Sequence, residues 1–156
     1  QIKSLIKNTD INNQQIGYSA FQDAKHFSAS LRREITRETV EWLRTLLPEN
    51  AYQIYAIKSV LFNWDILEPP VKEHYIDFVF DKLIKRGIHI NNIQLGFEIL
   101  FEIKPKYEEY TTYFEDVFSR IESEDNDEIK IELKNGLIKI RPKRLKKKEK
   151  SFWEKL

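Results

Sequence analysis

The sequence predicts a mainly α-helical protein, and three features support that class. Apolar side chains recur at helical spacing through the middle of the chain. The 156 residues include only four glycines, which is few for the many tight turns of a β-sandwich or barrel. A hydrophobic content of 41% with 33% charged residues is typical of a folded globular chain. We expect about five helices in antiparallel pairs, with HEAT- or armadillo-like stacking or as a compact bundle, followed by a C-terminal β-hairpin and a basic tail.

The predicted helices follow one another between residues that start or stop helices. Residues 1–30 show no clear pattern and are a poorly defined lead-in to a helical domain expected over residues 1–121. Pro48 ends the first helix, Asn50 is placed to cap the second, and Gly87 lies where the residue after the third is expected. The five helices are predicted over residues 31–47, 51–64, 71–86, 91–103 and 106–121.

Two helix pairs resemble each other in sequence. Pro70, Glu73, Tyr75 and Asp81 recur 35 residues later as Pro105, Glu108, Tyr110 and Asp116. A period of this length with two helices per unit is typical of an α-solenoid of the HEAT or armadillo kind. Chance similarity between two amphipathic helices is the alternative.

A hairpin is predicted after the last of these helices. Residues 122–128 are acidic and are expected to form a hinge. In residues 129–141, the dipeptide Asn135 and Gly136 is a strong signal for a two-residue turn, because both residues tolerate positive φ. This turn would place Ile131, Leu133, Ile138 and Ile140 on one face, which we expect to be buried. The end of the helical stack, residues 2–6 as a third strand, or a further part of a longer protein would cover that face.

The charge of the chain is uneven, which indicates an interaction segment. Residues 129–156 carry eleven Lys or Arg against three Glu, so their net charge is +8 and that of the remaining chain is −7. Residues 142–156 form the predicted basic tail. The candidate contacts to nucleic acid or another anionic partner are Arg141, Lys143, Arg144, Lys146, Lys147, Lys148 and Lys150. A solubilising tail, a nuclear-import signal and a strip for an anionic membrane surface are the alternatives.

Four aromatic residues are candidates for an interaction surface. Phe78 and Tyr113 lie off the main apolar stripes at matching positions of the predicted repeat, and could equally pack against a neighbouring repeat. Phe152 and Trp153 lie beside the basic run, where aromatic rings can stack on bases or dock on an apolar patch.

Sites for catalysis are weakly indicated. His74, Asp77 and Asp81 share a helix face and could present metal ligands, but such spacing is more typical of a solvated charged stripe. Two E-x-K triplets, which begin at Glu128 and Glu132, resemble part of the PD-(D/E)xK pattern of metal-dependent nucleases. The Pro-Asp element of that pattern is absent. No phosphate-binding glycine motif and no nucleophile elbow occurs, so we expect neither an enzyme nor a cofactor.

The expected function is therefore a non-catalytic protein-interaction or scaffolding module, and the alternative is a nucleic-acid-associated domain that binds through its basic tail. The chain begins at Gln1 and contains no Met, so we expect it to be a fragment of a larger protein. The absence of cysteine fits an intracellular setting, cytoplasmic or nuclear. No apolar run approaches the roughly 20 residues that cross a bilayer.

Overall fold

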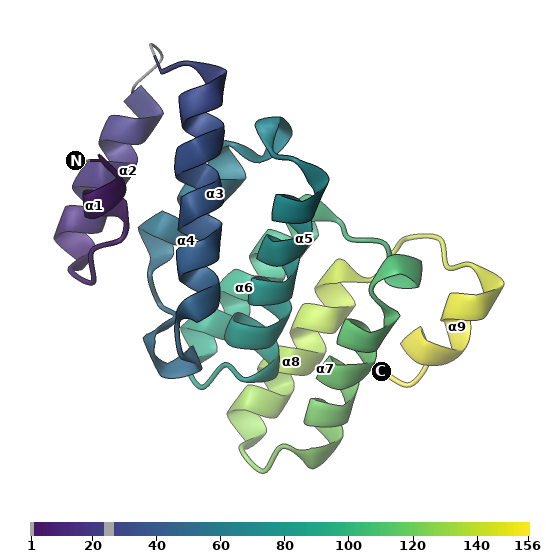
Figure 1. Ribbon diagram of the computed structural model, residues 1–156. Helices are drawn as coiled ribbons and strands as arrows, with labels where there is room; N and C mark the ends of the chain where they lie inside the picture. The colour runs from purple at the N-terminus through teal and green to yellow at the C-terminus, as the bar shows by residue number, and fades with distance from the viewer. Residues whose placement is uncertain (1, 24–26) are drawn as a thin grey trace. The chain divides into compact units, whose positions relative to one another are not determined.

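The computed structural model describes residues 2–23 and 27–156, and helices joined by loops make up this part of the chain (Figure 1). It contains nine α-helices, three short 3-10 turns and one π-helical segment, η3, with no strand among the described residues. The predicted mainly α-helical class is confirmed. The α-helices and the π-helix are α1 (Ile2–Ile6), α2 (Ile11–Asp23), α3 (Ala29–Thr45), α4 (Ile54–Phe62), α5 (Pro69–Phe78), η3 (Val79–Lys85), α6 (Ile90–Ile103), α7 (Thr111–Ser123), α8 (Asp127–Ile140) and α9 (Lys147–Trp153).

The chain divides into two compact units, residues 1–78 and residues 79–156. The first unit contains α1 to α5. Tyr75 is fully buried in the apolar core of this unit, and its hydroxyl donates a hydrogen bond of 2.8 Å to the carbonyl of Ile57. Arg32 Nε donates to Asn63 Oδ1 at 2.9 Å, which satisfies a buried amide.

Helices α1 and α2 occupy the lead-in that showed no pattern in the sequence. They pack closely at Gly17, where an added Cβ would lie 2.7 Å from the Cβ of Leu5. The polar side chain of Gln14 in α2 is fully buried and hydrogen-bonds Gln53. Because α2 packs through a buried amide side chain as well as apolar residues, it has no continuous apolar stripe by which a helix is recognised in a sequence.

The second unit begins with the π-helical segment and continues through α6, α7, α8 and α9. Phe80 in η3 stacks on Tyr113 of α7 with ring centroids 5.0 Å apart, and it makes a T-shaped contact with Phe114 at 5.3 Å between centroids. Leu83 and Ile84 of the same segment are fully buried. The apolar face of the predicted fifth helix thus packs on η3, although the α-helix itself begins at Thr111, after a 3-10 turn over Tyr107–Glu109.

The predicted β-hairpin is wrong, because residues 127–140 form helix α8. Asn126 caps this helix, with its Oδ1 accepting hydrogen bonds from the backbone N–H of Glu128 at 3.0 Å and of Ile129 at 3.2 Å. Leu133 and Leu137, four residues apart, are fully buried on one face. Ile131 and Ile138, which the hairpin would have buried, are more than half exposed.

Gly136 allows two helices to pack closely. The hairpin prediction placed this residue in a turn instead. No glycine among the described residues has a positive φ. A Cβ at Gly136 would overlap the ring of Phe97 in α6, so the glycine lets the two helices approach. Helices α6 and α8 run parallel, since Gln94 hydrogen-bonds Glu132 at 3.1 Å and Lys139 lies over the ring of Phe101 at 5.5 Å, an offset of 38 residues in both pairs.

The basic tail over residues 142–156 is also partly folded. Helix α9 is docked by Phe152 and Trp153, which are buried against aromatic rings of the second unit. Phe152 lies 5.0 Å from Tyr107, and Trp153 lies 5.7 Å from Phe114, between ring centroids. Of the predicted acidic hinge over residues 122–128, only the three residues between the end of α7 and the start of α8 form a link; the others belong to these two helices.

The predicted HEAT-like repeat is not supported. Pro70 lies within α5, whereas Pro105 precedes a 3-10 turn. Tyr75 is fully buried, whereas its counterpart Tyr110 is only partly buried. The predicted cap at Asn50 is also wrong, because Gln53 precedes α4.

Candidate functional site

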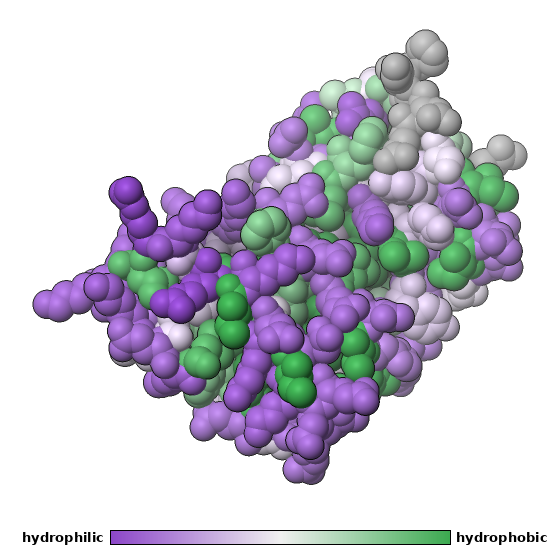
Figure 2. Space-filling view, turned by 180° about the vertical axis from the view of Figure 1, so that it is seen from behind, coloured by the Kyte–Doolittle hydropathy of each residue, from purple (hydrophilic) through white to green (hydrophobic). Residues whose placement is uncertain are grey.

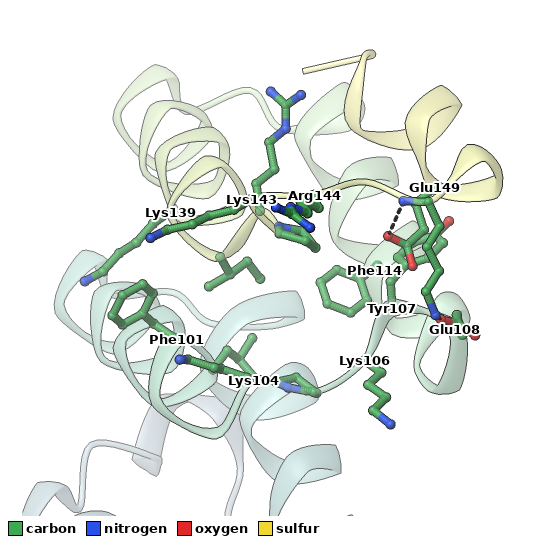
Figure 3. Close-up of a pocket in the computed structure, with 16 residues that line it drawn as sticks. Phe101, Lys104, Lys106, Tyr107, Glu108, Phe114, Lys139, Lys143, Arg144 and Glu149 are labelled. Carbon is green, nitrogen blue, oxygen red and sulfur yellow. Dashed lines mark hydrogen bonds and ion pairs between the residues drawn. The ribbon is translucent and has the colours of Figure 1, made fainter.

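A basic groove lies in the second unit, where the C-terminal ends of α6 and α8 come together (Figure 3). Its volume is about 820 Å³. One bank is formed by residues 100–108, which lead from α6 toward α7, and the other by residues 139–149, which lead from α8 into α9. The parallel packing of α6 on α8 brings these two segments, which are far apart in the sequence, to the same end of the unit.

The first bank turns at Lys104. This residue ends α6 in the left-handed conformation, with φ 56° and ψ 58°, and its backbone N–H donates to the carbonyl of Leu100 at 2.8 Å. Pro105 follows and prevents the helix from continuing. The turn leaves Lys104 and Lys106 at the edge of the cavity, with Phe101 near Lys104 and the side chain of Lys106 running outward (Figure 3).

The second bank turns at Arg141, the C-cap of α8, and Pro142. Figure 3 shows Lys139, Lys143 and Arg144 on the side of the cavity opposite Lys104 and Lys106. The segment is tied to the first bank by an ion pair between Lys146 Nζ and Glu108 Oε1.

The groove carries a strong excess of positive charge. Its lining contains seven cationic side chains and two carboxylates, which gives a formal net charge of +5. The C-terminal ends of two helices each contribute roughly half a negative charge, which offsets about one of these cations. The cations are Lys104, Lys106, Lys139, Arg141, Lys143, Arg144 and Lys146, and the carboxylates are Glu108 and Glu149.

The ion pair across the groove changes the proton affinity of both partners. The hydrogen bond from Lys146 holds the pKa of Glu108 below its usual value, and the same bond raises the pKa of Lys146. Both side chains are exposed to solvent, so salt screens their attraction. The pair is therefore a weak tie that a competing anion can open.

Glu149 is the other carboxylate, and it has a structural partner. Its side chain is 5% exposed, and Oε2 accepts a hydrogen bond of 3.4 Å from the backbone N–H of Lys146, which caps α9.

Burial is the main cause that raises the pKa of Tyr107, and the nearby charges of Glu115 and Glu149 add to it. Tyr107 thus remains a neutral phenol at physiological pH.

Aromatic and apolar side chains line the groove between the two banks. Tyr107 and Phe114 lie on the side toward α9, and Phe101 lies on the side toward α8, where Lys139 contacts its ring (Figure 3). Phe101 is 50% exposed, whereas Phe114 is buried. The groove therefore offers an accessible aromatic ring among cations, a combination that suits a ligand with both a negative charge and a planar apolar part.

The candidate anion contacts from the sequence divide into two groups. Arg141, Lys143, Arg144 and Lys146 line the groove. The other candidates are exposed on α9 and are not part of the lining; they are Lys147, Lys148 and Lys150.

The sequence analysis predicted one bank of the groove in part and missed the other. Among the lining residues it missed are Phe101, Lys104, Lys106, Tyr107 and Lys139. The signal for the first bank was the Lys-Pro-Lys run of residues 104–106 directly after a predicted helix. Its relation to the basic run at residues 141–150 depends on the packing of α6 on α8, and the hairpin interpretation excluded that packing.

The four aromatic candidates do not form a surface. Phe78, Phe152 and Trp153 are buried, with at most 5% of each exposed. Tyr113 is partly buried and stacks on Phe80. Phe78, Phe152 and Trp153 belong to the packed interior, as expected for aromatic rings that bury large apolar areas.

The enzyme alternatives gain no structural basis from the described residues. No group of three or more His, Cys, Asp or Glu in this part of the chain could hold a metal ion. His74 instead contacts Glu41 at 2.9 Å, and Asp81 pairs with Arg86 at 2.6 Å. The E-x-K triplets lie on α8, where residues two apart do not face each other as they do in a strand.

Comparison of the chain with protein-family models, with curated proteins and with solved structures finds no match. Among the described residues, no helix is both long and apolar enough to cross a membrane.

Proposed function

We propose that this chain is a non-catalytic binding module that holds nucleic acid in the basic groove of its second unit. The single observation that carries the proposal is that seven cationic residues from two distant segments line one cavity. Like charges repel, so a cluster of cations around one cavity is unfavourable unless an anion compensates it. An anionic ligand that lies between the banks relieves that repulsion.

The types of side chain support a phosphate ligand. Arg141 and Arg144 carry planar guanidinium groups, which can donate two parallel hydrogen bonds to one phosphate. The lysines act as point charges that contact phosphates without fixed geometry. Such contacts are largely independent of sequence and weaken steeply with added salt.

A protein ligand with an acidic segment is the competing partner, and it corresponds to the interaction module that the composition suggests. The exposed ring of Phe101 favours nucleic acid over a chain of carboxylates, because bases supply aromatic faces as well as charge. On the face shown in Figure 2, apolar residues are scattered among hydrophilic ones. That distribution is ordinary for a protein surface and does not mark a large apolar interface.

Binding of a fluorescein-labelled oligonucleotide, followed by anisotropy over about 50 to 200 mM salt, tests the proposal. The variant with Lys104→Gln, Lys143→Gln and Arg144→Gln removes three groove cations. We expect it to bind at least about tenfold more weakly. The slope of log affinity against log salt should fall by about two, since each single-strand phosphate contact contributes roughly 0.7.

A matched control removes three exposed cations of the first unit, with Arg33→Gln, Arg37→Gln and Lys58→Gln. It changes the net charge by the same amount and should leave the salt slope unchanged. Equal loss in both triple variants would mean that net charge alone governs binding. Polyglutamate that binds more tightly than the oligonucleotide would favour an acidic protein partner.

A further inference from the structure

We infer that the groove takes single-stranded rather than duplex nucleic acid, with one base stacked on the ring of Phe101. This inference rests on the proposed function and specifies its ligand. Phe101 is 50% exposed at the C-terminal end of α6 and belongs to the lining of the groove. Its ring is accessible at the same place where Lys139, from the other bank, lies 5.5 Å from its centroid.

The arrangement of charge orients a nucleotide in the groove. Lys104 and Lys106 lie on one side, and Lys143 and Arg144 on the other (Figure 3). The C-terminal ends of α6 and α8 meet the groove with partial negative charge, which repels a phosphate but not a neutral base. Phosphates are therefore favoured at the cationic rim, and bases are favoured toward the helix ends and Phe101.

Only an unpaired strand can satisfy both parts of this site. In a duplex, each base is stacked between its neighbours, so a duplex can contact the rim cations but cannot place a base on Phe101 without unstacking. A single strand has free base faces, and every base has one, so stacking tolerates different sequences. We expect a modest preference among bases and a clear preference for single strands.

The test compares an oligo(dT) strand with a duplex of the same length at fixed salt, for the unmodified chain and two matched variants. Phe101→Ala removes the groove ring, and Phe62→Ala removes a phenylalanine of similar exposure, 47%, in α4 of the first unit. We expect the unmodified chain to bind oligo(dT) about tenfold or more tightly than the duplex. Phe101→Ala should abolish that preference with duplex affinity within about twofold of the unmodified chain, and Phe62→Ala should preserve it.

A second variant keeps the result interpretable if Phe101→Ala alters folding. Phe101→Trp retains an aromatic face, so it should bind oligo(dT) at least as tightly as the unmodified chain. The tryptophan fluorescence gained by this variant should be quenched by a stacked base. Quenching by oligo(dT) without quenching by the duplex is the expected signature.

The outcomes separate this inference from the proposed function. Equal affinity for strand and duplex, or an equal loss of both in Phe101→Ala, overturns the single-strand inference. The nucleic-acid function then stands if the groove triple variant still binds more weakly than its control. If dTMP competes with an affinity equal to that of oligo(dT), the single-strand inference is also overturned, in favour of a small-molecule pocket. Absence of binding to either nucleic acid overturns both.

Discussion

Gly136 of α8 lies directly against the ring of Phe97 in α6, so closely that any Cβ at this position would overlap the ring. This contact sets the distance between the two parallel helices. It therefore also sets the distance between the two banks of the groove, which begin where these helices end. The Asn-Gly dipeptide that suggests a turn in the sequence is thus a packing element of a helix pair.

Gly136→Ala tests this relationship. In an exposed helix, replacing Gly by Ala stabilises by about 0.5–1 kcal/mol. Here the added methyl group has no space, so we expect a net loss of about 1–3 kcal/mol in the free energy of unfolding, measured by urea denaturation. Asn135→Ala, at the exposed neighbouring position of the same helix, should change stability by only a few tenths of a kcal/mol. A stabilising Gly136→Ala would contradict the close contact with Phe97.

Lys104→Gly should separate stability from binding. Lys104 is a non-glycine residue with positive φ, a conformation that costs an L-residue roughly 1 kcal/mol and costs glycine nothing. The variant should therefore be more stable by about 0.5–1 kcal/mol. It should also bind nucleic acid more weakly, because a groove cation is lost. Lys106→Gly serves as the control, since its φ is −74° and no backbone strain is relieved there.

Glu124 provides a pH-dependent test of packing in the second unit. Its carboxylate accepts hydrogen bonds from Arg120 Nη2 at 2.9 Å and from Nε at 3.2 Å, and these bonds hold the pKa of Glu124 below its usual value. A carboxyl whose pKa is lower in the folded state stabilises the fold above its unfolded pKa. That contribution is lost as the pH falls through the depressed value.

Glu124→Gln should thus cost about 0.5 kcal/mol at neutral pH and nothing in acid below the depressed pKa. Denaturant titrations of both proteins at several pH values measure the difference. A difference that is constant with pH would show that Arg120 and Glu124 do not form this bond in solution.

The fold was predictable from the sequence where helices bury one continuous apolar face. Leu43, Ile57, Leu83 and Phe114 are all buried as their spacing predicts. In α8 the apolar residues satisfy both periods: Ile131, Leu133, Ile138 and Ile140 alternate as in a hairpin, whereas Leu133 and Leu137 share a helix face. The Asn126 cap and the packing on Phe97 decide between these periods, and only the second of them depends on residues distant in the sequence.

The groove was predictable on one side only. The cations of residues 141–146 form a dense run that any charge analysis finds. The other side depends on the parallel packing of α6 on α8, which no local sequence pattern specifies. This packing makes Lys104, Lys106 and Phe101 part of the groove. Phe152 and Trp153 were misjudged for the same reason, because their burial depends on Tyr107 and Phe114, more than 35 residues earlier in the chain.

The most direct test of the nucleic-acid groove is a titration of the ¹⁵N-labelled chain with oligo(dT), followed residue by residue through its amide resonances. We predict saturable shifts concentrated in residues 100–108 and 139–149, with residues 29–62 of α3 and α4 unaffected. Fast-exchange shifts that map instead to α3 and α4, or a spectrum unchanged at low salt, would contradict the assignment of this groove as the binding site.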